Sequence, residues 1–165
     1  MSLIFFILGY IMASLDVVLG SIDILPDMAG FILLTIGLIP VASARKMSPF
    51  HCIWPILGLI FNVSVMIIGS SLGAIILIVL QEAALFMTVL VLSRAMFPDR
   101  PKGSTQSLLF QSMLTAQCFL VITNVFAGLL GSVELLAIFV LLFQIIFIIF
   151  EVVIVCRRWP ARPIY

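Results

Sequence analysis

Glu82 is the residue of this sequence whose type and position are best suited to chemistry. It lies beside Gln81, and long apolar stretches flank the pair on both sides. A carboxylate at the centre of a membrane-spanning helix costs about 2.5–3.5 kcal/mol on insertion scales, so it must meet other helices, a proton or a polar cavity. Two interpretations stay open: Glu82 handles a proton or a cation, or it holds helices together through hydrogen bonds.

Amide and carboxyl side chains occur at the same distances from two Gly-Ser pairs. Asn62 and Asn124 each precede such a pair by seven residues, and Glu82 and Gln144 follow the same glycines by thirteen. This repetition favours duplicated helical hairpins, although Gly-Ser is also a common turn pair whose spacing can coincide by chance. If one polar interior binds a proton, a small cation or a solute, its candidate residues are Glu82, Gln81, Asn62, Asn124 and Gln144.

Three carboxylates, Asp16, Asp23 and Asp27, lie within twelve positions around Pro26. Proline is tolerated in a first helical turn, and an acidic residue there interacts well with the helix dipole. The segment therefore predicts a well-formed helix start. A second interpretation is a non-cytoplasmic acidic cluster for a hard cation or a cationic solute, because oxygen ligands suit such ions.

Cysteine and histidine give no metal-binding pattern. The three cysteines form no C-x-x-C pair, and the single histidine, His51, cannot build a zinc site alone. No Ser/His/Asp set, H-E-x-x-H motif or phosphate-binding loop is present. We therefore expect no metal, no cofactor and no enzymatic activity.

The composition excludes a soluble globular protein. Hydrophobic residues make up 64% and charged residues 9% of the 165 positions, and mean hydropathy is +1.40. Soluble domains are about 45–50% apolar and about 25% charged. A net charge of +1 argues against nucleic acid as a partner, since that requires a basic face. The chain is expected to be an integral membrane protein.

Apolar runs divide the chain into six candidate membrane-spanning helices, each judged against the roughly 20 residues needed to cross a bilayer. No basic residue precedes the first run, so we expect it to be a retained span rather than a cleaved signal. The six runs cover residues 3–19, 27–43, 49–69, 72–95, 108–130 and 133–156.

All Lys and Arg residues lie at the end of the second, fourth or sixth run or directly after it, in clusters that include Arg45, Arg94 and Arg157. The positive-inside rule places these clusters and both termini in the cytoplasm. The expected fold is all-α: a polytopic membrane protein with six transmembrane helices in three helical hairpins, at about 1–46, 47–102 and 103–165. Together the hairpins form one bundle, residues 1–165.

Small residues four positions apart indicate where helices approach closely. Gly9 with Ala13 is one such pair, and Gly69 with Gly73 is another. Pairs of this kind allow two helix backbones to come into contact in a membrane.

Residues 22–38 resemble the I-D-x-L-P-D-x-x-G-x-x-L-x-x-x-G-L signature of uncharacterised small multi-pass membrane proteins of Gram-positive bacteria. The positions that carry the resemblance are Asp23, Pro26, Asp27, Gly30 and Gly37. In that family the signature also follows the first span and opens the second. The resemblance covers about a tenth of the chain. It implies a bacterial plasma membrane and no particular activity.

Two functions fit these features. The first is a small transport, channel or solute-binding subunit with a polar interior site, which would bind a small cation, a proton or a solute. The second is a non-transporting accessory, immunity or regulatory membrane protein whose polar residues serve helix packing. In either case the partners are the lipid bilayer and a second copy or another membrane protein.

Overall fold

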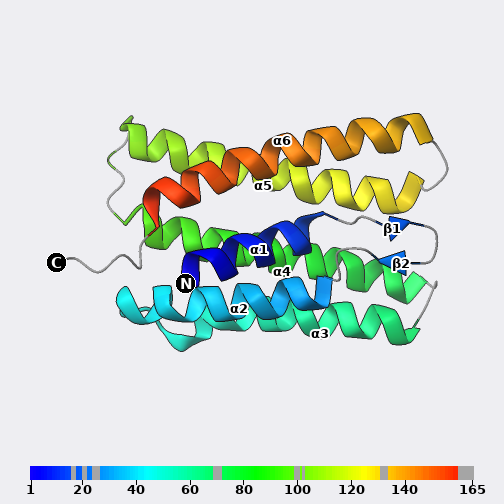
Figure 1. Cartoon of the computed structure of the whole chain (residues 1–165), viewed down its shortest axis with the longest axis horizontal. Helices are drawn as coiled ribbons and strands as arrows, with labels where there is room; N and C mark the ends of the chain where they lie inside the picture. Colours follow the sequence, from blue (N-terminus) through cyan, green and yellow to red (C-terminus); the bar gives the residue numbers. More distant parts are fainter. Residues whose placement is uncertain are drawn as a thin grey trace.

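The computed structural model describes residues 1–15, 18–19, 22–23, 27–68, 72–98, 101, 103–130 and 134–159. Within these ranges the chain is all-α apart from one minimal sheet, as the apolar runs predicted, and its helices run side by side along one long axis (Figure 1). The α-helices are α1 (Ser2–Ser14), α2 (Asp27–Ala44), α3 (Ile53–Ile68), α4 (Leu72–Met96), α5 (Thr105–Leu130) and α6 (Glu134–Arg158).

Four of the described helical segments are long and apolar enough to cross a membrane: Asp27–Ala44, Phe50–Ile68, Ile75–Met96 and Thr105–Thr123. The segment Phe50–Ile68 joins a short 3₁₀ helix, η1 (Pro49–Cys52), to α3. Large apolar side chains such as Ile36 and Ile60 are half exposed on the outer surface. Surfaces of this kind fit lipid rather than water, and they indicate a membrane-embedded protein.

The first predicted span differs from the structure. Its helix was expected to reach residue 19, but α1 ends at Ser14. Val18–Leu19 form strand β1, which pairs antiparallel with β2 (Ile22–Asp23), so that Val18 lies opposite Asp23. The prediction was too long because β-branched residues such as Val18 suit a strand as well as a membrane span. With 13 residues, α1 is about 20 Å long, which is shorter than a bilayer core of about 30 Å.

The helices form two outer pairs, α2 with α3 and α5 with α6, and α1 and α4 lie between these pairs (Figure 1). The start of α1 and the end of α6 are in contact. Trp159, which follows α6, donates from its indole N–H to Ser2 Oγ at 3.4 Å. Its ring lies 5.5 Å from that of Phe6. Both ends of the described chain therefore lie at one end of the bundle.

Backbone contact between α1 and α2 depends on glycine. A Cβ atom at Gly9 would lie 2.5 Å from the backbone nitrogen of Leu34, and one at Gly37 would lie 2.6 Å from that of Phe6. A Cβ atom at Gly30 would lie 2.7 Å from the nitrogen of Ala13. The close approach predicted from Gly9 and Ala13 is confirmed. The structure also gives a physical reason for two glycines of the signature.

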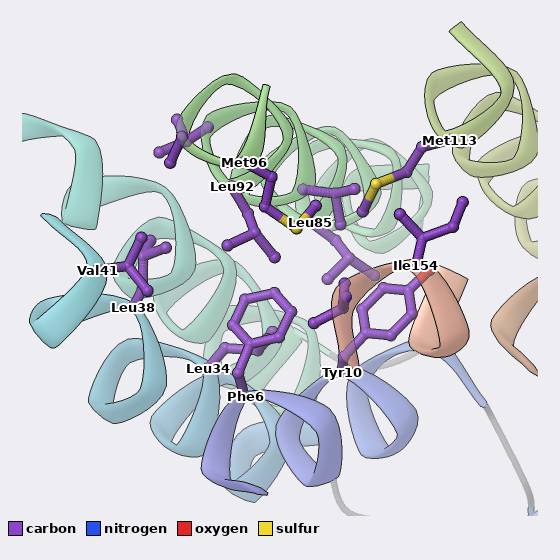
Figure 2. Close-up of a cluster of buried hydrophobic side chains, with 14 of the residues drawn as sticks. Phe6, Tyr10, Leu34, Leu38, Val41, Leu85, Leu92, Met96, Met113 and Ile154 are labelled. Atoms are coloured by element: carbon purple, nitrogen blue, oxygen red, sulfur yellow. The ribbon is translucent and has the colours of Figure 1, made fainter. Parts of the chain in front are cut away.

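The apolar core lies where α1, α2 and α4 meet. Phe6 and Tyr10 of α1 point into the same cluster as Leu34 of α2 and Leu85 and Leu92 of α4 (Figure 2). These five side chains are at most 2% exposed. Tyr10 carries a hydroxyl group into this apolar cluster, and that group must find hydrogen-bond partners.

Candidate functional site

Three polar side chains from three helices meet inside the bundle: Tyr10 of α1, Gln117 of α5 and Glu151 of α6. They are 2%, 0% and 1% exposed. The Tyr10 hydroxyl oxygen lies 2.7 Å from Gln117 Oε1 and 2.5 Å from Glu151 Oε2. We call this group the Tyr10 cluster. It links the first helix of the chain to the last two.

Each member of the Tyr10 cluster lies on the buried stripe of its helix, where apolar residues three or four positions away are buried too. Gln117 lies between Met113 and Leu120, and Glu151 lies between Ile148 and Ile154. A helix places residues with this spacing on one face. The packing of apolar neighbours therefore draws the three polar groups into the bundle.

The Tyr10 cluster is deep in the bundle. Tyr10 lies eight residues after the start of α1, Gln117 twelve after the start of α5, and Glu151 seven before the end of α6. At 1.5 Å per residue these positions are about 10–18 Å from the helix ends at the side of the bundle where α1 and α5 begin and α6 ends. A carboxyl group at such a depth in lipid or protein cannot be left bare as a charge.

Proton counting limits the states of this cluster. A phenol has one proton, and neither a carboxylate nor an amide oxygen can donate. Tyr10 can therefore donate to only one of its two close oxygens. When it donates to Gln117 Oε1, the contact with Glu151 Oε2 requires a proton on that carboxyl group. When Glu151 is ionised and accepts from Tyr10, the Gln117 amide must turn so that Nε2 faces the phenol oxygen.

Gln117 and Glu151 each have one polar atom that forms no hydrogen bond with the described residues. Gln117 Nε2 and Glu151 Oε1 are buried and make no hydrogen bond within the described part of the chain. An unsatisfied buried polar atom costs about 1–3 kcal/mol. The Tyr10 cluster therefore keeps one donor and one acceptor that have no partner among the described residues.

A second acid lies near the Tyr10 cluster. Glu82 of α4 is 6% exposed, and both Glu82 and Glu151 are close enough to Tyr10 to act on it electrostatically. Ser14 and Gln144 are also buried, one turn beyond Tyr10 and two turns before Glu151. Among the residues whose burial the structure describes, Glu82 and Glu151 are thus the two buried carboxyl groups, whereas the sequence interpretation used only Glu82.

A second polar network joins α2, α3 and α4. Asp27 Oδ2 accepts from Gln81 Nε2 at 2.8 Å and from Asn62 Nδ2 at 3.4 Å. Asn62 Nδ2 also donates to Gln81 Oε1 at 3.3 Å. We call these residues the Asp27 network. Its groups bond to one another across three helices, which is a common way to hold membrane helices together.

The residues expected to form one interior site therefore divide between two places. Glu82 and Gln144 are buried in the bundle, while Gln81 and Asn62 belong to the Asp27 network. Asp27 was expected in a separate acidic cluster and instead lies with these two amides. Asp23 lies in β2. Asp16 and the side chains of Asp23 and Asn124 are outside the described residues.

Sequence reasoning missed Tyr10, Gln117 and Glu151. One available signal was the spacing of Glu151, which follows Gln144 by seven residues and so shares its helix face. Nothing local marks Tyr10 or Gln117, because tyrosine and glutamine are also common near membrane surfaces.

No metal site emerges from the described residues, in which no three His, Cys, Asp or Glu side chains are placed to hold an ion. No protein-family model, curated protein or solved structure matches the chain. The resemblance at residues 22–38 stays a prediction. Function must therefore be argued from the two polar groups and the helices that carry them.

Proposed function

We propose that the chain is a bacterial plasma-membrane protein with six membrane-spanning helices in three hairpins and both termini in the cytoplasm. Four helices meet the length and hydropathy of a span, and α6 adds 25 residues, about 37 Å of helix. The sixth proposed span is α1, whose 13 helical residues are shorter than the bilayer core. The ends of α2, α4 and α6, where basic residues gather, lie at one end of the bundle (Figure 1). The positive-inside rule assigns that end to the cytoplasm.

Within this membrane protein, we propose a small transport, channel or solute-binding subunit whose Tyr10 cluster takes up and releases a proton. The observation that carries this proposal is the contact of the Tyr10 hydroxyl with both Gln117 Oε1 and Glu151 Oε2. One phenolic proton cannot serve both oxygens. The two contacts therefore require either a proton on Glu151 or a turned Gln117 amide, and this choice of two states supports a proton site.

The two arrangements of the Tyr10 cluster link that proton to the helices. With the proton bound, Glu151 donates to Tyr10, and Tyr10 donates to Gln117 Oε1. With the proton released, Tyr10 donates to the Glu151 carboxylate, and the turned Gln117 amide donates to Tyr10. Protonation of Glu151 on α6 thus changes the orientation of the Gln117 amide on α5. Glu82 on α4 is the nearby acid able to pass or receive the next proton.

A second candidate function is the non-transporting accessory or regulatory protein. The Asp27 network favours it, because there the polar groups bond to one another across α2, α3 and α4. If the Tyr10 cluster had the same role, its substitution would change stability and leave proton movement untouched.

Proton movement across liposomes that contain the purified protein separates these functions. We expect the wild type to dissipate an imposed pH gradient and Glu151→Gln to lose this activity, because glutamine keeps the shape of the side chain and cannot release a proton. Asp27→Asn is the matched control, because it neutralises a carboxylate that serves packing. Equal proton movement in wild type, Glu151→Gln and empty liposomes would overturn the proposal.

A further inference from the structure

A groove of about 480 Å³ runs along the outer surface between α5 and α6. Its walls differ in chemistry. Exposed polar side chains of α5, Gln111, Ser112 and Thr115, form one part, and aromatic side chains that include Phe119 and Phe147 form another. On a membrane protein, an outward groove of this kind opens to lipid.

The polar side chains of the groove lie nearer the start of α5 than the aromatic ones do. Gln111 lies six residues after the start of α5, about 9 Å along the helix, and Thr115 lies about 15 Å along it. Further along, the rings of Phe119 and Phe147 stack at 5.6 Å and close the groove between the helices. A ligand that enters from the start of α5 therefore passes Leu108, then meets amide and hydroxyl groups, and reaches aromatic carbon afterwards.

The size of the groove fits a hydrocarbon chain better than an α-helix. An α-helix about 10–12 Å in diameter would fill 480 Å³ with little more than one turn. The volume lies within the range of about 300–1,000 Å³ that is usual for small-molecule sites. A hydrocarbon chain that lies along the groove can contact both helices over its length.

Positive charge continues the groove toward the end where α5 begins. Arg157 follows Phe150, a lining residue, by seven positions, so it lies on the same face of α6. Arg157 and its neighbour Arg158 are exposed. Basic side chains at a membrane surface attract anionic headgroups with about 1 kcal/mol each. The apolar groove and the arginines together match the two halves of an anionic phospholipid.

We propose that the α5–α6 groove binds one anionic phospholipid, with an acyl chain against Phe119 and Phe147 and the phosphate at Arg157 and Arg158. Gln111 donates to the ester oxygens between these two parts. This site is separate from the Tyr10 cluster, which lies on the inner faces of the same helices. A bound lipid would hold α5 against α6 from outside.

Native mass spectrometry of protein released from mixed phosphatidylglycerol and phosphatidylcholine nanodiscs tests the proposal. We expect one phosphatidylglycerol molecule to remain bound in preference to phosphatidylcholine. Arg157→Gln lowers this preference about fivefold, the equivalent of about 1 kcal/mol. Thr115→Phe fills the groove and removes the retained lipid altogether.

Two matched controls identify the site. Arg94→Gln removes an exposed arginine at the end of α4, and Ile122→Phe enlarges an exposed residue of α5 outside the groove lining. Both are expected to retain phosphatidylglycerol like the wild type. No lipid preference in the wild type, or equal losses in the controls, would overturn the proposal. A dimer that persists without lipid and is lost in Thr115→Phe would also overturn it and assign the groove to a second copy.

Discussion

Tyr10, Gln117 and Glu151 illustrate how one hydroxyl group can set the protonation of an acid in a bundle interior. The phenol is the shared partner, and both oxygens around it lie at hydrogen-bond distance. Removing one partner leaves the others buried and unsatisfied, which costs more than the hydrogen bond itself contributes. Single substitutions at this site therefore report on the whole group.

Tyr10→Phe removes the shared hydroxyl group and keeps the aromatic ring in the core. We expect it to lower the free energy of unfolding by about 1–3 kcal/mol, because Glu151 and Gln117 lose their common partner. Glu151→Gln should cost less, since its amide can still donate to Tyr10. Unfolding in detergent measures both variants. A larger loss in Glu151→Gln than in Tyr10→Phe would contradict this assignment of donors and acceptors.

The hydrogen bond between Asp27 and Gln81 can be tested directly, by measuring the interaction energy of the two side chains. A double-mutant cycle with Asp27→Ala and Gln81→Ala should return an interaction energy of about 0.6–1.7 kcal/mol, the range of bonds between membrane helices. Pairing Asp27→Ala with Thr88→Ala provides the control, since the Thr88 hydroxyl bonds within its own helix at Ala84. Strict additivity for Asp27 and Gln81 would show that this bond does not form.

At the scale of elements, α1 and α2 act as one unit because their backbones touch at glycines. Gly30 and Gly37 lie seven residues apart on one face of α2, and both meet α1 without room for a Cβ atom. This contact fixes α1, and therefore Tyr10, relative to α2. The short length of α1 makes the contact more important, since the helix has few turns over which to pack.

Enlarging Gly37 should separate these helices. Gly37→Leu places a side chain against the backbone of Phe6, and overpacking of this kind typically costs about 1–3 kcal/mol. Thermal unfolding in detergent measures the loss, and Ala44→Leu at the exposed end of α2 is the control. An unchanged melting temperature for Gly37→Leu would contradict the close α1–α2 contact.

At the scale of the whole molecule, the sequence predicted the helix bounds better than the site. Apolar runs separated by polar or glycine breaks located α2 and α4 to within a residue or two at each end. The end of α1 could not be found this way, because apolar residues continue to position 19 past Ser14 and only Asp16 interrupts them. The Tyr10 cluster joins positions 107 and 141 apart in sequence. Local periodicity cannot tell which distant helices meet.

The proposed topology makes a prediction of its own. In a background with Cys52, Cys118 and Cys156 replaced by alanine, we expect Pro101→Cys to react only with reagents that reach the cytoplasmic side. Ile68→Cys, at the opposite end of the bundle, should react only from outside. Both positions are exposed. Labelling of Pro101→Cys from outside in intact cells would contradict the orientation.

Infrared difference spectroscopy of the reconstituted protein tests the central claim most directly, because it detects the carbonyl stretch of a protonated carboxyl group. A change of pH should produce carboxylic-acid bands, and the band of Glu151 should be present in the wild type and in Asp27→Asn and absent in Glu151→Gln, whereas any band of Glu82 stays in all three. Tyr10→Phe should shift the frequency of the Glu151 band, since the acid loses its hydrogen-bond partner. An unchanged set of bands in Glu151→Gln would contradict a proton site at the Tyr10 cluster.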